Sequence, residues 1–124
     1  MQRRNRILLG LALGLGAILF SRLAGGALNT AVTFFQQVTP GEAHPGDVVT
    51  VTGYALDAAH LKEIYLTDGQ IDYQVEILDQ SEASVRLRVP AKIPAGQMRF
   101  AIIVAGRPEL LEEPLFLKIL PQRG

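Results

Sequence analysis

Residues 40–53 constrain the fold of this chain more than any other stretch. They read PGEAHPGDVVTVTG, which is two proline-glycine turns followed by an alternating segment and a closing glycine. Gly41 and Gly46 are free to take the positive φ values that tight turns require. The stretch therefore predicts a double turn that leads into a strand.

The strand predicted after these turns is Asp47–Tyr54. Val49 and Val51 share one face and the threonines share the other, a period of two that is typical of a half-buried β-strand. Gly53 ends the pattern where a side chain would crowd a bend or a neighbouring backbone.

Turn-forming residues separate several further β-prone segments. These are Ala31–Thr39, Lys62–Thr67, Gln70–Leu78, Ser84–Val89, Gln97–Ala105 and Leu115–Leu120. About seven short strands without an amphipathic helix indicate an all-β chain, an immunoglobulin-like β-sandwich whose short connections favour antiparallel order. The residues expected to set its turns and fold are Pro40, Pro45, Gly46, Asp47, Gly53, Asp68 and Gly69.

The strands around Asp68-Gly69 are expected to form a hairpin. An Asp-Gly pair between two strands predicts a two-residue type I′ turn, in which both central residues have positive φ. The returning strand, Gln70–Leu78, alternates without a break, so Tyr73 is expected in the core. Later in the chain, Glu112-Glu113-Pro114 is expected to precede the last strand and to protect an exposed edge from pairing.

The first 28 residues have the composition of a leader. A basic segment with Arg3, Arg4 and Arg6 precedes the uncharged apolar run Ile7–Phe20. The length of this run suits a signal peptide that is cleaved between Gly26 and Ala27. If the apolar segment is instead counted as far as Leu28, it suits an uncleaved, tilted membrane anchor. In either case the segment is expected to be an apolar helix that precedes the sandwich. Both interpretations place the remaining domain outside the cytoplasm, in the periplasm or the extracellular space.

The rest of the chain divides simply. Residues 29–33 are expected to be a short linker or the start of the first strand, residues 34–120 the sandwich and residues 121–124 a tail. If the leader stays uncleaved, it holds the domain at the membrane; if it is cleaved, the domain is released.

The charge of the domain argues against nucleic-acid binding. Four of the twelve Lys and Arg residues lie before Gly26, which leaves eight against twelve Asp and Glu. A mildly acidic domain lacks the basic surface that binds phosphate backbones. Hydrophobic residues at 48% and charged residues at 19% also exclude a disordered chain.

The sequence offers no catalytic, cofactor or metal motif. There is no cysteine, and the two histidines, His44 and His60, fall in separate predicted loops without a nearby set of ligands. We therefore expect a protein that is not an enzyme and has no cofactor or small-molecule substrate. Outward-facing Tyr65, Arg86 and Arg88 are the candidate interaction face, because aromatic and arginine side chains are common at interfaces.

Several short motifs resemble those of the IPT/TIG family of immunoglobulin-like domains. Pro40 and then Pro45–Tyr54 (PGDVVTVTGY) match the start of such a domain, Arg88–Ala91 (RVPA) matches a later strand end, and Pro94–Gly96 (PAG) matches the glycine before the penultimate strand. The resemblance extends from Phe34 to Ile119. It implies an interaction or spacer module; the family's DNA-binding members use basic loops, and the loops here are neutral or acidic.

These observations lead to a functional hypothesis. We expect an exported, non-enzymatic binding or structural module of the cell envelope that contacts another envelope protein. The alternative is a module that binds a carbohydrate or surface polymer, for which three tyrosines and no tryptophan make a poor aromatic platform.

Overall fold

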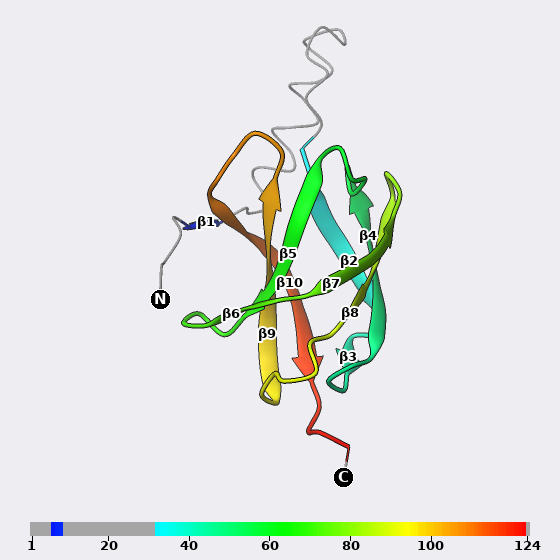
Figure 1. Cartoon of the computed structure of the whole chain (residues 1–124), viewed down its shortest axis with the longest axis vertical. Helices are drawn as coiled ribbons and strands as arrows, with labels where there is room; N and C mark the ends of the chain where they lie inside the picture. The colour runs from blue at the N-terminus through cyan, green and yellow to red at the C-terminus, as the bar shows by residue number, and fades with distance from the viewer. Residues whose placement is uncertain (1–5, 9–31, 124) are drawn as a thin grey trace, which may run out of the picture.

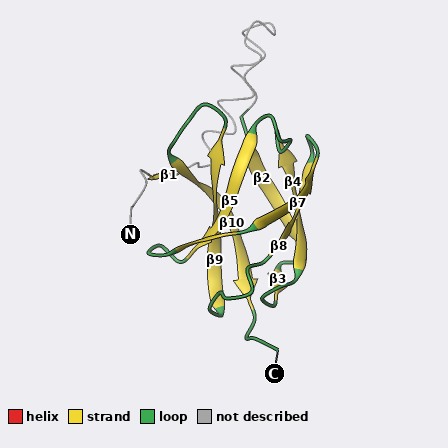
Figure 2. Ribbon diagram, in the orientation of Figure 1, coloured by secondary structure: helices red, strands yellow, loops and turns green. Residues whose placement is uncertain are grey.

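The computed structural model describes residues 6–8 and 32–123, and this part of the chain consists of strands and loops (Figures 1 and 2). No helix within it is long and apolar enough to cross a bilayer. The strands are β1 (Arg6–Leu8), β2 (Phe34–Thr39), β3 (Glu42–Ala43), β4 (Val48–Tyr54), β5 (Leu61–Thr67), β6 (Asp72–Gln74), β7 (Glu76–Gln80), β8 (Ser84–Arg88), β9 (Gly96–Val104) and β10 (Leu110–Ile119).

The strands form two sheets. The larger has the order β1-β10-β9-β5-β6, with β3 also paired to β10, and the smaller has the order β2-β4-β8-β7. The all-β prediction is confirmed. Pairing is antiparallel except where β1 and β3 lie parallel to β10, which the sequence did not indicate. Arg6–Leu8, expected at the start of the leader, form β1; the rest of the predicted leader helix lies outside the described residues.

The hydrophobic core lies between the two sheets. Alternate residues of β4 and β8 face it from the smaller sheet, and Ile64, Leu66 and Phe100 face it from the larger one. Phe35 and Phe100 meet edge to face across the core, with ring centroids 5.4 Å apart. Burying a large aliphatic or aromatic side chain contributes about 1.5–3 kcal/mol, so these strands are held together mainly by this layer.

Gly46 and Asp47 take the turn roles expected of them, whereas Gly41 has no positive φ and Glu42–Ala43, expected within the double turn, form β3. Gly46 has a φ of 90° and its N–H donates to the carbonyl of Val89, while the Asp47 carboxylate accepts from the N–H of His44. A Cβ on Gly53 would lie 2.0 Å from the carbonyl oxygen of Phe34 on β2. Gly53 is therefore required by close approach of a neighbouring strand.

The predicted strand Gln70–Leu78 is wrong as a single element. The chain changes sheets at buried Val75: β6 pairs with β5 in the larger sheet, and β7 pairs with β8 in the smaller one. The Val75 N–H donates to the carbonyl of Ile64 at the crossing. Tyr73, expected in the core, is partly buried and packs against it.

The turn at Asp68-Gly69 also differs from the prediction. Thr67 pairs with Asp72, so four residues connect the strands, and Ala55 is the one non-glycine residue with positive φ in the described chain. Asp68 instead accepts the N–H groups of Gln70 and Ile71 on its side-chain Oδ1, both at 2.8 Å. The side chain thus closes the turn that a type I′ backbone was expected to make.

Candidate binding face

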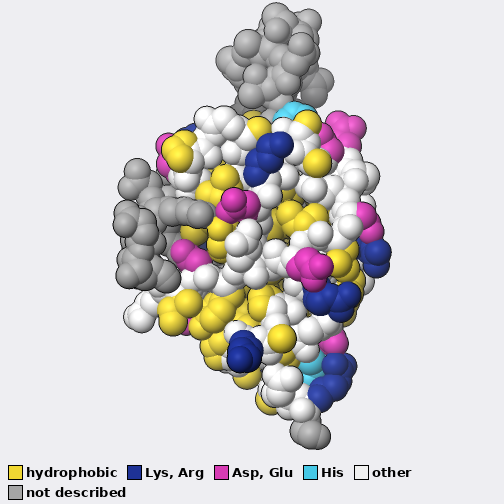
Figure 3. Space-filling view, viewed as in Figure 1, with side chains coloured by type: hydrophobic (Ala, Val, Ile, Leu, Met, Phe, Trp, Pro, Cys, Tyr) yellow, Lys and Arg dark blue, Asp and Glu magenta, His cyan; other side chains and the backbone are white. Residues whose placement is uncertain are grey.

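The larger sheet has an outer face, turned away from the core, that carries polar, charged and aromatic side chains. Because side chains alternate along a strand, Thr67 of β5, Gln97 and Arg99 of β9 and Phe116 of β10 lie on this face, while their neighbours Leu66, Met98 and Leu117 enter the core. We call this surface the outer face. Figure 3 shows one side of the molecule, on which hydrophobic side chains gather and charged ones of both signs are scattered.

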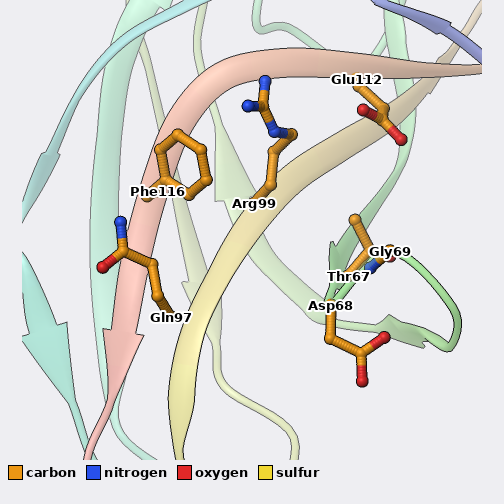
Figure 4. A pocket seen from close by; sticks show the side chains of 7 residues that line it. All are labelled: Thr67, Asp68, Gly69, Gln97, Arg99, Glu112 and Phe116. Carbon is orange, nitrogen blue, oxygen red and sulfur yellow. The ribbon is translucent and has the colours of Figure 1, made fainter.

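A shallow depression lies on the outer face where the end of β5 meets β9 and β10. It is lined by Thr67, Asp68, Gly69, Gln97, Arg99, Glu112 and Phe116 (Figure 4). The register places these residues together: Thr67 pairs with Arg99, which in turn pairs with Phe116. The pairing of β9 with β10 shifts between Glu112 and Phe116, which separates these two side chains along the rim.

Arg99 and Phe116 form the most distinctive pair in the depression. The guanidinium carbon of Arg99 lies 4.4 Å from the centroid of the Phe116 ring, a cation–π arrangement. The same guanidinium donates from Nη1 to the carbonyl of Glu113 at 3.3 Å. Phe116 is nevertheless 40% exposed, so an aromatic edge and a held cation are both presented to solvent.

The size of the depression limits what it can bind. Its cavity volume is about 160 Å³, whereas sites for small-molecule ligands usually enclose ~300–1,000 Å³. The depression is therefore closer in size to the small hollows of a flat protein contact surface than to a substrate pocket.

The structure does not bring the three predicted interaction residues together. Tyr65 lies on the outer face of the larger sheet, whereas Arg86 and Arg88 lie on the outside of the smaller one. Tyr65 is also only 8% exposed, since it packs with Ala101 and Leu110 in a second apolar cluster. A strand pattern shows which residues face outward but not which sheet they belong to.

The two arginines pair with carboxylates on the neighbouring strand. Arg86 lies 2.8 Å from Asp79 and Arg88 lies 3.4 Å from Glu76, each pair joining β8 to β7. Such exposed pairs contribute little to stability, about 0–1 kcal/mol. The charges of Arg86 and Arg88 are therefore balanced by neighbouring carboxylates.

Glu113 was expected to protect an exposed edge, and this is wrong: its side chain is fully buried. Its Oε1 accepts the N–H of Phe35 on β2 at 2.7 Å, and its Oε2 has no hydrogen-bond partner among the described residues. Burial raises the pKa of Glu113 to about 8, against the smaller lowering effect of the Phe35 N–H. The carboxyl group therefore joins β10 to β2, and so one sheet to the other.

The histidines lie at opposite ends of β4, since His44 precedes it and His60 follows it. His60 Nδ1 is 2.8 Å from Asp57, whose pKa is lowered mainly by this hydrogen bond. In residues 6–8 and 32–123 no three His, Asp or Glu side chains are grouped so as to hold a metal ion.

Asp47 of the opening motif binds the C-terminal tail. Arg123 Nη1 donates to its Oδ1 at 2.8 Å, and this bond, with the N–H of His44, lowers the pKa of Asp47 to about 2. Asp47 therefore stabilises the turn that precedes β4 and holds the C-terminal tail against it.

Sequence reasoning missed Arg99, Phe116 and Glu112 as candidate site residues. One signal was present: Phe116 and Lys118 alternate with Leu115, Leu117 and Ile119, which places an aromatic residue on the outer side of the last strand. The position of Phe116 beside Arg99 depends on the order of the strands in the sheet, and the alternation of residues along one strand does not encode that order.

Comparisons with known proteins identify the fold only. No protein-family model matches the chain, and no curated protein sequence matches it. A protein of unknown function from Bacteroides thetaiotaomicron is similar in structure, with a TM-score of 0.60 and 20% identity over 74% of this chain and 22% of that one. The chain thus covers about a fifth of that protein's length.

Two weaker similarities involve binding proteins from Bacteroides ovatus. One is SGBP-B of a mixed-linkage glucan utilization locus, in complex with a heptasaccharide (TM-score 0.48, 13% identity, 65% of this chain and 22% of that one). The other is an auxiliary nutrient binding protein (TM-score 0.45, 17% identity, 71% and 22%). At these scores the likeness supports no inference about a ligand.

Proposed function

We propose that this chain is an exported, non-enzymatic binding module of the immunoglobulin-like, IPT/TIG type, and that it contacts another envelope protein through the outer face. Export is supported by the basic and apolar leader at residues 1–28. The observation that carries the contact is the Arg99–Phe116 pair, exposed on a shallow surface. Arginine and aromatic side chains dominate the energetics of protein interfaces.

Two properties of the outer face favour a protein over a small ligand or a polysaccharide. The depression is smaller than a typical ligand pocket. In addition, one face of the Phe116 ring is engaged by Arg99, and the ring of Tyr54 on the smaller sheet stacks on Phe34 at 6.4 Å. Each of these exposed rings therefore has one face engaged by a neighbouring side chain, which reduces the aromatic surface open to a sugar.

Site-specific photocrosslinking tests the proposal. A photoreactive phenylalanine analogue is placed at Phe116 in the full chain, expressed in cells, and crosslinked in intact envelopes. Tyr54 is the matched control, since it is an aromatic residue that is 53% exposed but lies on the smaller sheet. We expect a discrete crosslinked protein from position 116 that position 54 does not give.

The result is read against two other outcomes. If position 116 gives no adduct, or the same set as position 54, the outer face is not the contact surface. If Phe116→Ala instead abolishes binding to one class of glycan on an array, the carbohydrate alternative replaces the proposal. For a protein partner, Phe116→Ala is expected to weaken the complex by more than about fivefold, the usual loss for an interface anchor.

A further inference from the structure

The edge of β10 that faces away from β9 is a second surface of interest. β9 occupies one side of β10, and on the other side two short strands pair with it in parallel: β1 at Leu110–Glu112 and β3 at Lys118–Ile119. Between them lies Pro114, which has no N–H to donate. Leu110–Glu112 therefore form a separate three-residue segment that accepts a strand, which we call the acceptor segment (Figure 1).

The strand that occupies the acceptor segment comes from the predicted leader. The register pairs Arg6 with Leu110, Ile7 with Leu111 and Leu8 with Glu112. Either fate expected for the leader removes this strand. Cleavage after Gly26 releases it, and an anchor would hold Arg6 on the cytoplasmic side of a hydrocarbon layer ~30 Å thick, with the domain on the other side.

We infer that the acceptor segment is a docking site for an extended segment of another envelope protein, which pairs with it in parallel once β1 has left. An edge strand with unpaired N–H and C=O groups is a template for a further strand, and addition of a strand is a common mode of peptide recognition. The inference rests on the proposed export of the domain but not on the contact through the outer face.

The surroundings of the acceptor segment define the chemistry of its occupant. Glu109 and Glu112 lie at its two ends, and the side chains of Leu110 and Leu111 are buried. β1 itself supplies the sequence Arg-Ile-Leu. The occupant is thus an extended segment in which a basic residue precedes two aliphatic ones, as in the strand that β1 supplies in this register.

A peptide titration tests this site directly. The probe is a fluorescein-labelled peptide with the sequence of residues 3–9, RRNRILL, followed by fluorescence anisotropy. The receptor is the full chain in non-ionic detergent with Ile7→Pro and Leu8→Pro, which prevent β1 from pairing.

We expect saturable binding to this variant and at least about tenfold weaker binding to the unmodified chain, whose own β1 competes. A peptide of the same composition in scrambled order controls for charge and for binding to micelles. Hydrogen exchange provides a second measurement. Those amides of Leu110–Glu112 that point toward β1 should exchange roughly tenfold faster in the double variant, while those that point toward β9 and those of Val85 and Leu87 stay unchanged.

N-methylation of the peptide backbone distinguishes strand addition from side-chain docking. Adjacent N–H groups of a strand point to opposite sides. Methylating one of the two nitrogens of Ile and Leu should weaken binding by about tenfold, and methylating the other should change it by less than about twofold. Equal losses at both positions, no loss at either, or binding no tighter than that of the scrambled peptide would overturn the inference.

Failure here is separable from failure of the proposed function. The peptide experiment reports on the edge of β10, and the crosslink from position 116 reports on the outer face. A chain that binds the peptide but gives no crosslink retains the acceptor segment and loses the outer-face contact, and the converse holds equally.

Discussion

Glu113 buries a carboxyl group between the two sheets, with a single N–H donor for its two oxygens among the described residues. In the folded protein its pKa is raised to about 8, while an unfolded chain has the ordinary value of 4.5. Around neutral pH the folded state therefore retains a proton that the unfolded state has released. This contribution to stability is fully present below about pH 4.5, falls as the pH rises, and is lost above about pH 8.

The substitution Glu113→Gln isolates this effect. Its amide oxygen can still accept the Phe35 N–H and it does not titrate, so the fall in stability between pH 5 and 8 should flatten by a few kcal/mol. Urea unfolding across this pH range measures the change. Glu113→Ala is the contrasting variant: it leaves the Phe35 N–H unpaired and should cost about 2–4 kcal/mol at pH 5. Parallel pH profiles for the wild type and Glu113→Gln would contradict the assignment.

The role of Glu113 was not predictable from its sequence context. Two acidic residues before a proline are typical of an exposed edge, and the expectation followed from that pattern. The bulge in β10 between Glu112 and Phe116 turns Glu113 toward β2. A bulge of this kind changes the side that a residue faces without changing the composition of the segment.

At the scale of elements, the contact between β2 and β4 depends on Gly53. Gly53→Ala places a methyl group 2.0 Å from the Phe34 carbonyl oxygen, so the strands must separate locally. We expect a loss of about 2–4 kcal/mol in the free energy of unfolding, measured by urea denaturation.

Gly41 provides the matched control for this substitution. A Cβ at Gly41 would meet nothing within 4 Å, so Gly41→Ala should change stability by less than about 0.5 kcal/mol. Similar effects at the two glycines would show that close approach is not what requires Gly53.

Most strands were predictable because alternation directly reports a buried face. β4, β5, β8 and β9 fall within about two residues of their predicted bounds. The crossing at Val75 was not predictable for a physical reason. Tyr73 on one sheet and Ile77 on the other both pack against the same core, so the period of two continues through the change of sheet.

At the scale of the whole molecule, the sheets share one core and are joined by the chain at Val75 and by the Glu113–Phe35 hydrogen bond. We therefore expect them to unfold together. The chain has no tryptophan, so Tyr54→Trp and Phe116→Trp each introduce a single reporter, one in each sheet. Their urea midpoints should coincide, after correction for any change in stability, with each other and with circular dichroism. A separate, earlier transition at one reporter would show that its sheet unfolds independently.

The arrangement of the whole molecule also decides which outward-facing residues meet on one surface. Tyr65 and Arg86 have the same outward pattern in the sequence, yet they lie on different sheets. Arg99 and Phe116 are adjacent only because β9 lies next to β10. The site depends on strand order, and strand order depends on contacts between residues far apart in the chain.

The position of the two ends of the domain has a mechanical consequence. The described domain begins at Val32 beside β2 and ends beyond β10 at its opposite end (Figure 1). A force applied between Val32 and Arg123 acts along the strands and loads the β2–β4 and β9–β10 hydrogen bonds together, because these bonds run perpendicular to the strands. A force applied between Gly96 and Arg123 would instead open the β9–β10 hairpin one bond at a time. In a pulling experiment the first geometry should rupture at the higher force.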